Sequence, residues 1–215
     1  MRITNKGYYD RSEISNSMLG VYKNSLSGSR IRINKDALFL GSVVDSIITG
    51  SQMPAHVKSD ILIQSLEMAQ SFLSDSFNSF VVDNWEKQAA FIDNISFEFN
   101  GYIYHVHGRC LADFYDPQNG FLGDLKTTNQ TTEKGWLSSI NTFSYYRQAA
   151  WYMDITGCNS FTLMAVSKTK PYKLFRTIIR RGDALYNKGV SEYSNILGCL
   201  KMAYDGDEAM ANLLL

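Results

Sequence analysis

The spacing of the apolar residues changes along the chain, and this change limits the folds that the chain can adopt. In the first third, apolar side chains recur mostly at threes and fours, which is typical of helices. The pattern predicts a first helix that starts at the cap residue Ser15, a second at residues 36–48 and a third at residues 54–77. The second is apolar on all sides, so we expect it to lie at the centre of the fold.

Near residue 95 the apolar period falls to two, because Ile95, Phe97 and Phe99 alternate with polar neighbours. Further strands are expected at residues 102–115 and 121–127, which together make a β-meander. The elements expected after it are a helix at residues 142–155, strands at 161–168 and 172–179, and a helix at 183–204. This order predicts an α/β (α+β) fold in which a central mixed β-sheet is flanked by helices.

The composition fits one globular domain over residues 1–215, with 45% apolar and 20% charged residues. Lysines and arginines number 21, as do aspartates and glutamates, so the net charge is zero and any nucleic-acid surface must be local. Cys110, Cys158 and Cys199 form no C-x-x-C pair, which argues against a disulfide scaffold and a four-thiolate metal site. No apolar run reaches the roughly 18 to 20 residues of a membrane span, and the polar start of the chain predicts a cytoplasmic protein without a membrane partner.

Two strand-like runs flank the turn-forming residues 117–120, Pro-Gln-Asn-Gly, and this hairpin carries the most informative residues. A four-residue loop at this place puts Asp113 directly opposite Asp124, with their Cβ atoms about 5 Å apart. Lys126 follows Asp124 by two residues and therefore lies on the same face of the strand. We expect two carboxylates and one lysine to converge there.

Two facing carboxylates repel each other unless a cation lies between them or one of them binds a proton. Their oxygens suit Mg²⁺ or Mn²⁺, and a neighbouring lysine can position or deprotonate a water and stabilise a phosphate as negative charge develops. The arrangement is therefore typical of phosphodiester hydrolysis. The alternative from the residues alone is an exposed salt bridge between Asp124 and Lys126, since D-x-K is a common tripeptide.

Five separate segments occur in the order found in one nuclease superfamily. They are residues 14–19 (Ile-Ser-Asn-Ser-Met-Leu), 41–45 (Gly-Ser-Val-Val-Asp), 108–113 (Gly-Arg-Cys-Leu-Ala-Asp), 124–127 (Asp-Leu-Lys-Thr) and 148–152 (Gln-Ala-Ala-Trp-Tyr). Together they make the chain resemble the PD-(D/E)xK nuclease superfamily, in particular the branch of RecB and lambda exonuclease and, within it, the phage-type RecE exonuclease. The family usually has histidine where this chain has Asp45, and the glycine-to-aspartate spacing of the third segment is two residues longer here.

The resemblance implies a restriction-endonuclease-like core and gives particular residues their roles. Asp113 and Asp124 would hold Mg²⁺ or Mn²⁺, Asp45 would be a further ligand, and Leu125 would add its backbone carbonyl. Lys126 would orient the attacking water and stabilise the transition state. From the residues alone, Asp45 could instead cap a neighbouring backbone group within a buried helix.

Three further residues are expected to contact DNA. Gln148 and Tyr152 are four positions apart, so they share one face of a helix, and the resemblance implies that this face lies beside the metal. An ordinary half-buried amphipathic helix is the alternative for this pair. Thr127 has a hydroxyl that can donate to phosphate, although threonine is also a common strand residue.

These features together predict a Mg²⁺-dependent deoxyribonuclease of the exonuclease type, and the resemblance further implies that it digests linear duplex DNA from its ends, as in phage-type recombination. The resemblance also implies a homo-oligomer, a ring of three or four subunits, and a single-strand annealing protein as a further partner. Two alternatives remain open: a structure-specific endonuclease of the same superfamily, and a catalytically silent DNA-binding subunit.

Overall fold

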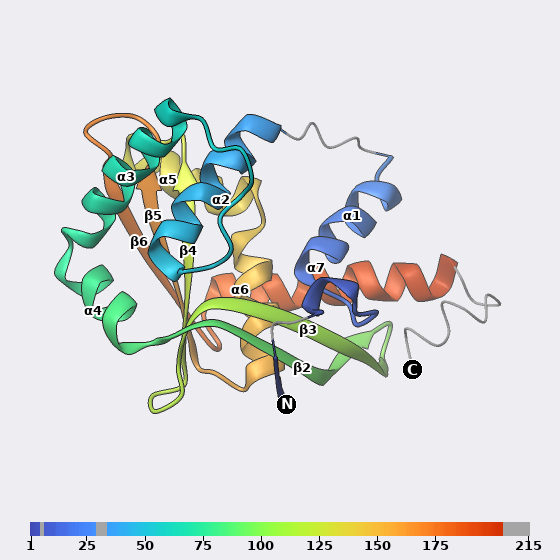
Figure 1. Cartoon of the computed structure of the whole chain (residues 1–215). Helices are drawn as coiled ribbons and strands as arrows, with labels where there is room; N and C mark the ends of the chain where they lie inside the picture. Colours follow the sequence, from blue (N-terminus) through green and yellow to red (C-terminus); the bar gives the residue numbers. More distant parts are fainter. Residues whose placement is uncertain (5–6, 29–33, 204–215) are drawn as a thin grey trace.

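A six-stranded sheet forms the centre of the protein in the computed structural model, which describes residues 1–4, 7–28 and 34–203 (Figure 1). The strands are β1 (Arg2–Ile3), β2 (Glu86–Phe99), β3 (Tyr102–Asp116), β4 (Phe121–Thr128), β5 (Ser160–Ser167) and β6 (Leu174–Arg180). They follow one another across the sheet in chain order; β4 and β5 pair in parallel, and the other neighbours are antiparallel. The predicted mixed sheet and its meander are therefore confirmed.

Helices surround this sheet. They are α1 (Asn16–Leu26), α2 (Lys35–Thr49), α3 (Ser59–Leu73), α4 (Ser76–Asn84), α5 (Glu133–Thr142), α6 (Tyr145–Thr156) and α7 (Ala184–Ala203), with a short 3₁₀ helix at Tyr8–Asp10. Ser15 caps α1 as predicted, since its hydroxyl accepts a hydrogen bond from the Met18 N–H at 3.3 Å. The last predicted helix is α7, and residue 204, its predicted end, lies outside the described residues.

Two predicted helices differ from those observed. The segment 54–77 was predicted as one helix, but residues 54–58 are not helical, and the remainder belongs to α3 and to the start of α4, which are separated at Asp75. The carboxylate of Asp75 accepts a hydrogen bond from the Asn78 N–H at 2.9 Å, so it caps a new helix. The helix predicted at 142–155 begins only after Ser144, whose backbone is left-handed (φ 51°), and the preceding α5 was not predicted.

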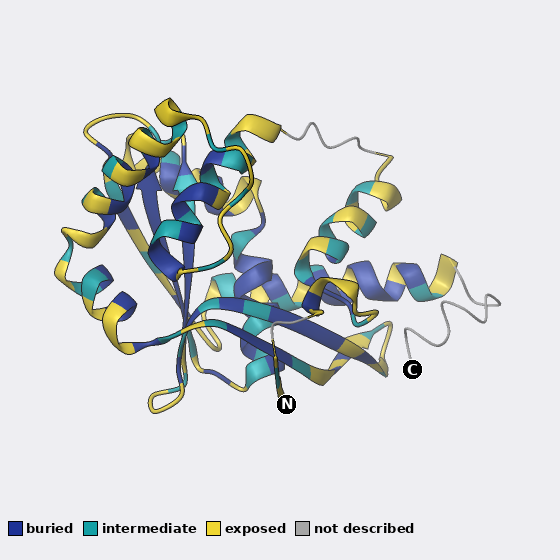
Figure 2. Ribbon diagram, viewed as in Figure 1, coloured by how far each residue is buried: buried dark blue, intermediate teal, exposed yellow. Residues whose placement is uncertain are grey.

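The helices cover both faces of the sheet, so that most of β4 and β5 is buried between them (Figure 2). On one face, α2, α3 and α4 pack in an apolar cluster that includes Val44 and Leu125. On the other face, α5 and α6 pack in a cluster that includes Ala149 and Leu122. Since Leu122 and Leu125 point to opposite faces, the even-numbered residues of β4 face α5 and α6. None of the described helices is long and apolar enough to cross a membrane.

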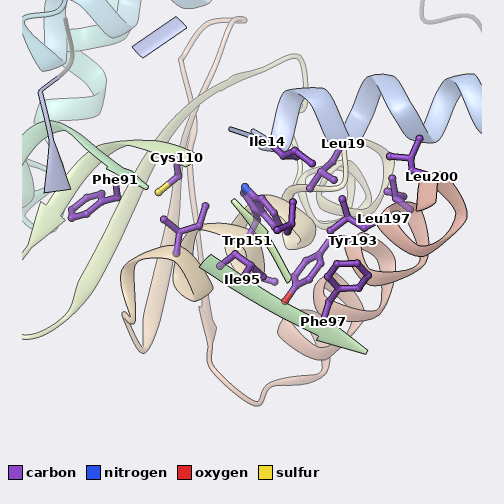
Figure 3. Packing of buried hydrophobic residues seen from close by; sticks show 14 of the residues in the cluster. Ile14, Leu19, Phe91, Ile95, Phe97, Cys110, Trp151, Tyr193, Leu197 and Leu200 are labelled. Atoms are coloured by element: carbon purple, nitrogen blue, oxygen red, sulfur yellow. The ribbon is translucent and has the colours of Figure 1, made fainter. Parts of the chain in front are cut away.

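The β2–β3 hairpin extends away from the other strands and lies against α1, α6 and α7 (Figure 1). Its inner face contributes Phe91, Ile95 and Phe97 to a third apolar cluster, in which Trp151 of α6 is central (Figure 3). Helix α6 comes very close to β3 at Gly108, where a Cβ atom would lie only 2.8 Å from Cζ2 of Trp151. Glycine is therefore required there for packing.

The β2–β3 ladder is interrupted at one position, opposite Asp113. The register passes from Lys87–Phe114 directly to Ala89–Ala112, and the intervening Gln88 has a left-handed backbone (φ 52°). Ala112 packs on the α6 side, whereas Phe114 packs in the cluster of α2, α3 and α4. Residues two apart on a regular strand share a face, so the strand turns over at Asp113.

Candidate active site where β3 and β4 separate

Asp113 lies where β3 and β4 diverge. The register predicted for this hairpin is confirmed for the three pairs next to the loop, the last of which joins Phe114 and Gly123. The next pair would join Asp113 and Asp124, but the ladder ends before it. Instead, Oδ2 of Asp113 accepts a hydrogen bond from the backbone N–H of Leu125 at 2.8 Å. The carboxylate of Asp113 thus takes the place of a backbone partner at the point of separation.

Asp124 and Lys126 lie together on the face of β4 that α6 covers. Nζ of Lys126 is 2.5 Å from Oδ2 of Asp124, and the two side chains are 20% and 4% exposed. Burial lowers the pKa of Lys126, but the neighbouring acidic groups, above all Asp124, together outweigh burial, so the net pKa is above its ordinary value. The ammonium also lies 5.1 Å from the ring centroid of Tyr145. Lys126 is therefore a half-buried cation at neutral pH, and its ion pair with Asp124 is not the exposed salt bridge of the alternative interpretation.

Gln148 approaches the same carboxylate from α6. Its Nε2 donates a hydrogen bond to Oδ1 of Asp124 at 2.6 Å, and both side chains are buried. Tyr152, four residues on, packs its ring edge-to-face against Phe161 with 5.7 Å between centroids. The structure therefore brings Gln148 to the acidic site and directs much of Tyr152 into the apolar interior, and the DNA contacts of both residues stay predictions.

Asp45 reaches the region from α2, on the opposite face of the sheet. Its Oδ2 accepts a hydrogen bond from the Ser51 hydroxyl at 2.9 Å, so its partner is a side chain beyond the helix end. Burial raises the pKa of Asp45, and the charge of Asp124 raises it further. Asp45 and Asp124 are thus close enough to influence each other although α2 and α6 lie on different faces.

The charges of both other acids act on Asp113. Burial raises the pKa of Asp113 well above the ordinary range of aspartate, and the charges of Asp124 and Asp45 add to this rise, while Lys126 opposes it. Three carboxylates therefore share one region of low solvent access with one ammonium. Such a set is destabilised when all three acids are ionised, unless further positive charge is supplied.

Thr127, the residue after Lys126, faces α2. Its Oγ1 lies 3.1 Å from the position that a Cβ on Gly41 would occupy, so the glycine of the second motif allows α2 to approach β4. This close approach also sets the position of Asp45, one helical turn along α2. Thr127 is partly exposed, and whether its hydroxyl binds phosphate stays a prediction.

The basic segment 168–181 offers less free charge than its composition indicates. Arg176 pairs with Asp75 at 2.8 Å, Lys170 with Glu67 and Arg181 with Asp154. Nζ of Lys168 donates to the carbonyl of Ala37 in α2 at 3.1 Å. Much of this segment therefore forms ion pairs and hydrogen bonds with helices, and only part of its positive charge is available to a phosphate backbone.

Comparison with known proteins identifies the family. Residues 21–210 match the family model of a PDDEXK-like domain of unknown function (DUF3799). The chain belongs to the DUF3799 family. The match covers most of the sequence and confirms both the resemblance to the PD-(D/E)xK nuclease superfamily and the corresponding fold. None of the curated proteins matches the chain.

Solved structures provide a second comparison for this DUF3799 protein. A candidate exonuclease from Eubacterium rectale is similar with a TM-score of 0.67 and 19% identity, over 96% of this chain and 88% of the other. An alkaline exonuclease from Laribacter hongkongensis has a TM-score of 0.42 at 14% identity, over 97% and 98% of the two chains. A phage-related exonuclease from Haemophilus somnus 129PT has 0.41 at 13% identity, over 89% and 96%. The first similarity supports the fold, and the other two scores are too low for any conclusion.

The donor set of this DUF3799 protein fits a hard divalent cation in its chemistry. Carboxylate oxygens are the ligands that Mg²⁺ and Mn²⁺ prefer, and Oδ2 of Asp124 is buried without a hydrogen bond of normal geometry, beside the Lys126 ammonium. Within the described part of the chain, no three histidine, cysteine or acidic side chains are close enough to form a ready metal site. The ligand set of Asp45, Asp113, Asp124 and the Leu125 carbonyl therefore stays a prediction.

The site also contains residues that the sequence did not reveal. Tyr145 lies beside Lys126, Ser51 binds Asp45, and Gln88 lies across from Asp113. None of them belongs to the motifs of the superfamily quoted above. Tyr145 could have been found from helical spacing alone, since it precedes Gln148 by three residues on the same helix face.

Proposed function

We propose that this protein is a deoxyribonuclease, dependent on Mg²⁺ or Mn²⁺, that hydrolyses the phosphodiester bonds of linear duplex DNA from its ends. The observation that best supports this proposal is the meeting of Asp113, Asp124 and Lys126 where β3 and β4 separate. They are the residues to which the resemblance to the PD-(D/E)xK superfamily gives catalytic roles, and the match to a PDDEXK-like family supports that superfamily. Raised pKa values at acids withdrawn from solvent, as at Asp45 and Asp113, are a common property of catalytic sites.

Asp113 and Asp124, with Asp45 and the Leu125 carbonyl, are the residues that would hold the cation. A bound divalent cation supplies positive charge to the phosphate and lowers the pKa of a water molecule that it binds. Lys126 stays protonated because Asp124 raises its pKa, so it can donate hydrogen bonds to phosphate oxygens as their negative charge increases.

Gln148 has a supporting role in the same proposal. Its amide holds Oδ1 of Asp124 and so fixes the orientation of that carboxylate. Tyr152 and Thr127 are proposed to contact the DNA strand next to the scissile bond. Each of these contacts adds to binding without requiring a large basic surface.

The zero net charge and the paired arginines and lysines favour substrate engagement by enclosure. We therefore propose a homo-oligomeric ring of three or four subunits around duplex DNA, since a ring multiplies a small positive patch by the number of subunits. A single-strand annealing protein would be the partner that receives the product strand.

A time course on matched linear and covalently closed plasmid with Mg²⁺ tests the proposal, with light scattering for the oligomeric mass. We expect the linear DNA to be degraded progressively, the circle to survive, and chelation of the metal to stop the reaction. Rapid linearisation of the circle would instead identify a structure-specific endonuclease. Binding of DNA without any cleavage would identify a catalytically silent subunit.

A further inference from the structure

Gln88 has an unusual backbone conformation for its place in the fold. It lies in β2 between two ladder pairs, yet its φ is 52°, in the left-handed region. Residues with a Cβ atom seldom adopt this region, and those that do are mainly asparagine, aspartate and histidine. Glycine would adopt the same backbone conformation without strain. The backbone conformation does not favour glutamine at this position, so the side chain of Gln88 is a candidate for a functional role.

The side chain of Gln88 reaches the acid on the neighbouring strand. Its Nε2 is 3.5 Å from Oδ1 of Asp113, and the backbone N–H of Leu125 donates to Oδ2 of the same carboxylate at 2.8 Å. Each oxygen of Asp113 therefore has its own donor. Hydrogen bonds at catalytic groups are often long in the free protein and shorten when ligands bind.

The same amide also contacts the end of α2. Nε2 of Gln88 donates to Oγ1 of Thr49 at 3.3 Å, and the Thr49 hydroxyl donates to the carbonyl of Asp45 at 2.8 Å. Ser51, just beyond the helix end, donates to the Asp45 carboxylate. One glutamine thus connects the element that carries Asp45 with the strand that carries Asp113.

We propose that Gln88 is a positioning residue for the metal site, and this inference rests on the proposed metal-dependent nuclease function. Its amide holds Asp113 at a set distance from the end of α2, so that Asp113 and Asp45 are presented to the same cation. The left-handed backbone is what directs the side chain of Gln88 toward both Asp113 and Thr49. Loss of the amide leaves Asp113 with a single donor and releases it from α2.

The test uses Gln88→Gly, which removes the amide and relieves the backbone strain at once. Asn100→Gly is the matched control, because Asn100 also has a left-handed backbone (φ 51°) but lies in the exposed β2–β3 turn. For Gln88→Gly we expect a melting temperature equal to or above that of the wild type and a Mn²⁺ affinity, measured by calorimetry, about tenfold lower. We also expect kcat to fall about tenfold while KM for DNA is unchanged. Asn100→Gly should leave affinity and turnover unchanged.

A second variant separates the amide from the backbone. Gln88→Met keeps the length of the side chain and the strain but removes the donor, and it should lose as much Mn²⁺ affinity as Gln88→Gly. Wild-type Mn²⁺ affinity in both variants would overturn the positioning role. A wild-type protein that binds Mn²⁺ but cuts no DNA would overturn the proposed function alone, since the affinity measurement does not depend on cleavage.

Discussion

The β2–β3 hairpin has two parts that differ in almost every respect. From Ala89–Ala112 to Phe99–Tyr102 the ladder is regular, and its inner side chains are apolar and buried against α6 and α7. At Gln88 and Asp113 the ladder is interrupted, the backbone is strained, and the side chains are polar and charged. The same two strands are therefore stabilised by apolar packing at one end, whereas at the other end they combine a strained backbone with poorly solvated charges.

The comparison indicates that the regular part of the hairpin serves the stability of the fold and that the interrupted part serves the proposed function. In the regular part, each buried side chain meets apolar neighbours, so a change there affects folding. At the interruption, the closely placed acids Asp113 and Asp124 weaken the fold when both are ionised, a cost that the proposed metal-binding role would account for. Changes at the two places should consequently give opposite results in stability and activity measurements.

The largest effect is expected from Asp124→Asn. This substitution removes the charge that attracts both a divalent cation and the Lys126 ammonium, so we expect metal binding and cleavage to be lost while the circular dichroism spectrum is unchanged. Asp93→Asn is the control, since Asp93 lies exposed on the regular part of the hairpin. Undiminished Mn²⁺ affinity in Asp124→Asn, measured by calorimetry, would remove Asp124 from the ligand set.

Phe97→Ala should instead lower the stability of the protein and leave its cleavage activity unchanged. Phe97 is 4% exposed and stacks on Tyr104 with 5.5 Å between ring centroids. We expect the free energy of unfolding to fall by about 3–5 kcal/mol in denaturant titrations, while the activity per folded molecule is unchanged. A loss of activity larger than the loss of folded protein would show that the two parts are not separate.

Lys126→Ala should slow turnover without preventing metal binding. Removal of one donor that stabilises the transition state costs about 10²–10³ in kcat, or about 2.7–4 kcal/mol, whereas an exposed ion pair contributes about 1 kcal/mol or less. Lys170→Ala is the matched control, because Lys170 forms an exposed pair with Glu67. If both variants cleave DNA at the wild-type rate, Lys126 serves only a salt bridge.

Gln148→Ala should have a smaller effect than Lys126→Ala. It leaves Oδ1 of Asp124 without its donor, and loss of such a supporting contact costs about tenfold or more in metal affinity or activity. Tyr152→Phe keeps the packing against Phe161 and tests the hydroxyl alone, so its effect should be smaller again. Steady-state cleavage and melting temperature should be measured together; unchanged specific activity with lowered stability would assign both residues to the core.

The smallest effect concerns stability and pH in the absence of metal. Because the pKa of Asp113 is raised in the folded protein, folding favours its protonated form. Its contribution is fully present below the unfolded pKa of about 3.9 and is lost as pH rises through the folded pKa. Asp113→Asn should therefore melt above the wild type at pH 7 with chelator, and this gap should narrow toward acid pH. A gap that widens on acidification would contradict the raised pKa.

Much of the fold was predictable because its signals are local. The turn residues 117–120 specify the loop, and the three pairs beside it follow from loop length. Helix α5 was missed although Thr132 caps it, because only Trp136 and Ile140 mark its buried apolar side. Two apolar residues are too few to distinguish a short helix from a loop by their spacing.

The candidate site was predictable only in part. Asp124 and Lys126 are two residues apart on one strand, so their meeting follows from strand geometry. The separation of β3 from β4 does not, because there Asp113 binds the Leu125 N–H and Gln88, 25 residues earlier in the sequence, contacts the same carboxylate. Contacts between segments that are far apart in the sequence leave no periodic signal.

The position of a bound cation tests the account most directly. Crystals soaked in Mn²⁺ would locate it through an anomalous difference map, without any dependence on the substrate. We predict a peak beside the carboxylates of Asp113 and Asp124 in the wild type, and none there in Asp124→Asn. A peak elsewhere in the molecule, or no peak at a Mn²⁺ concentration that supports cleavage, would contradict a metal-dependent site at the interruption of the ladder.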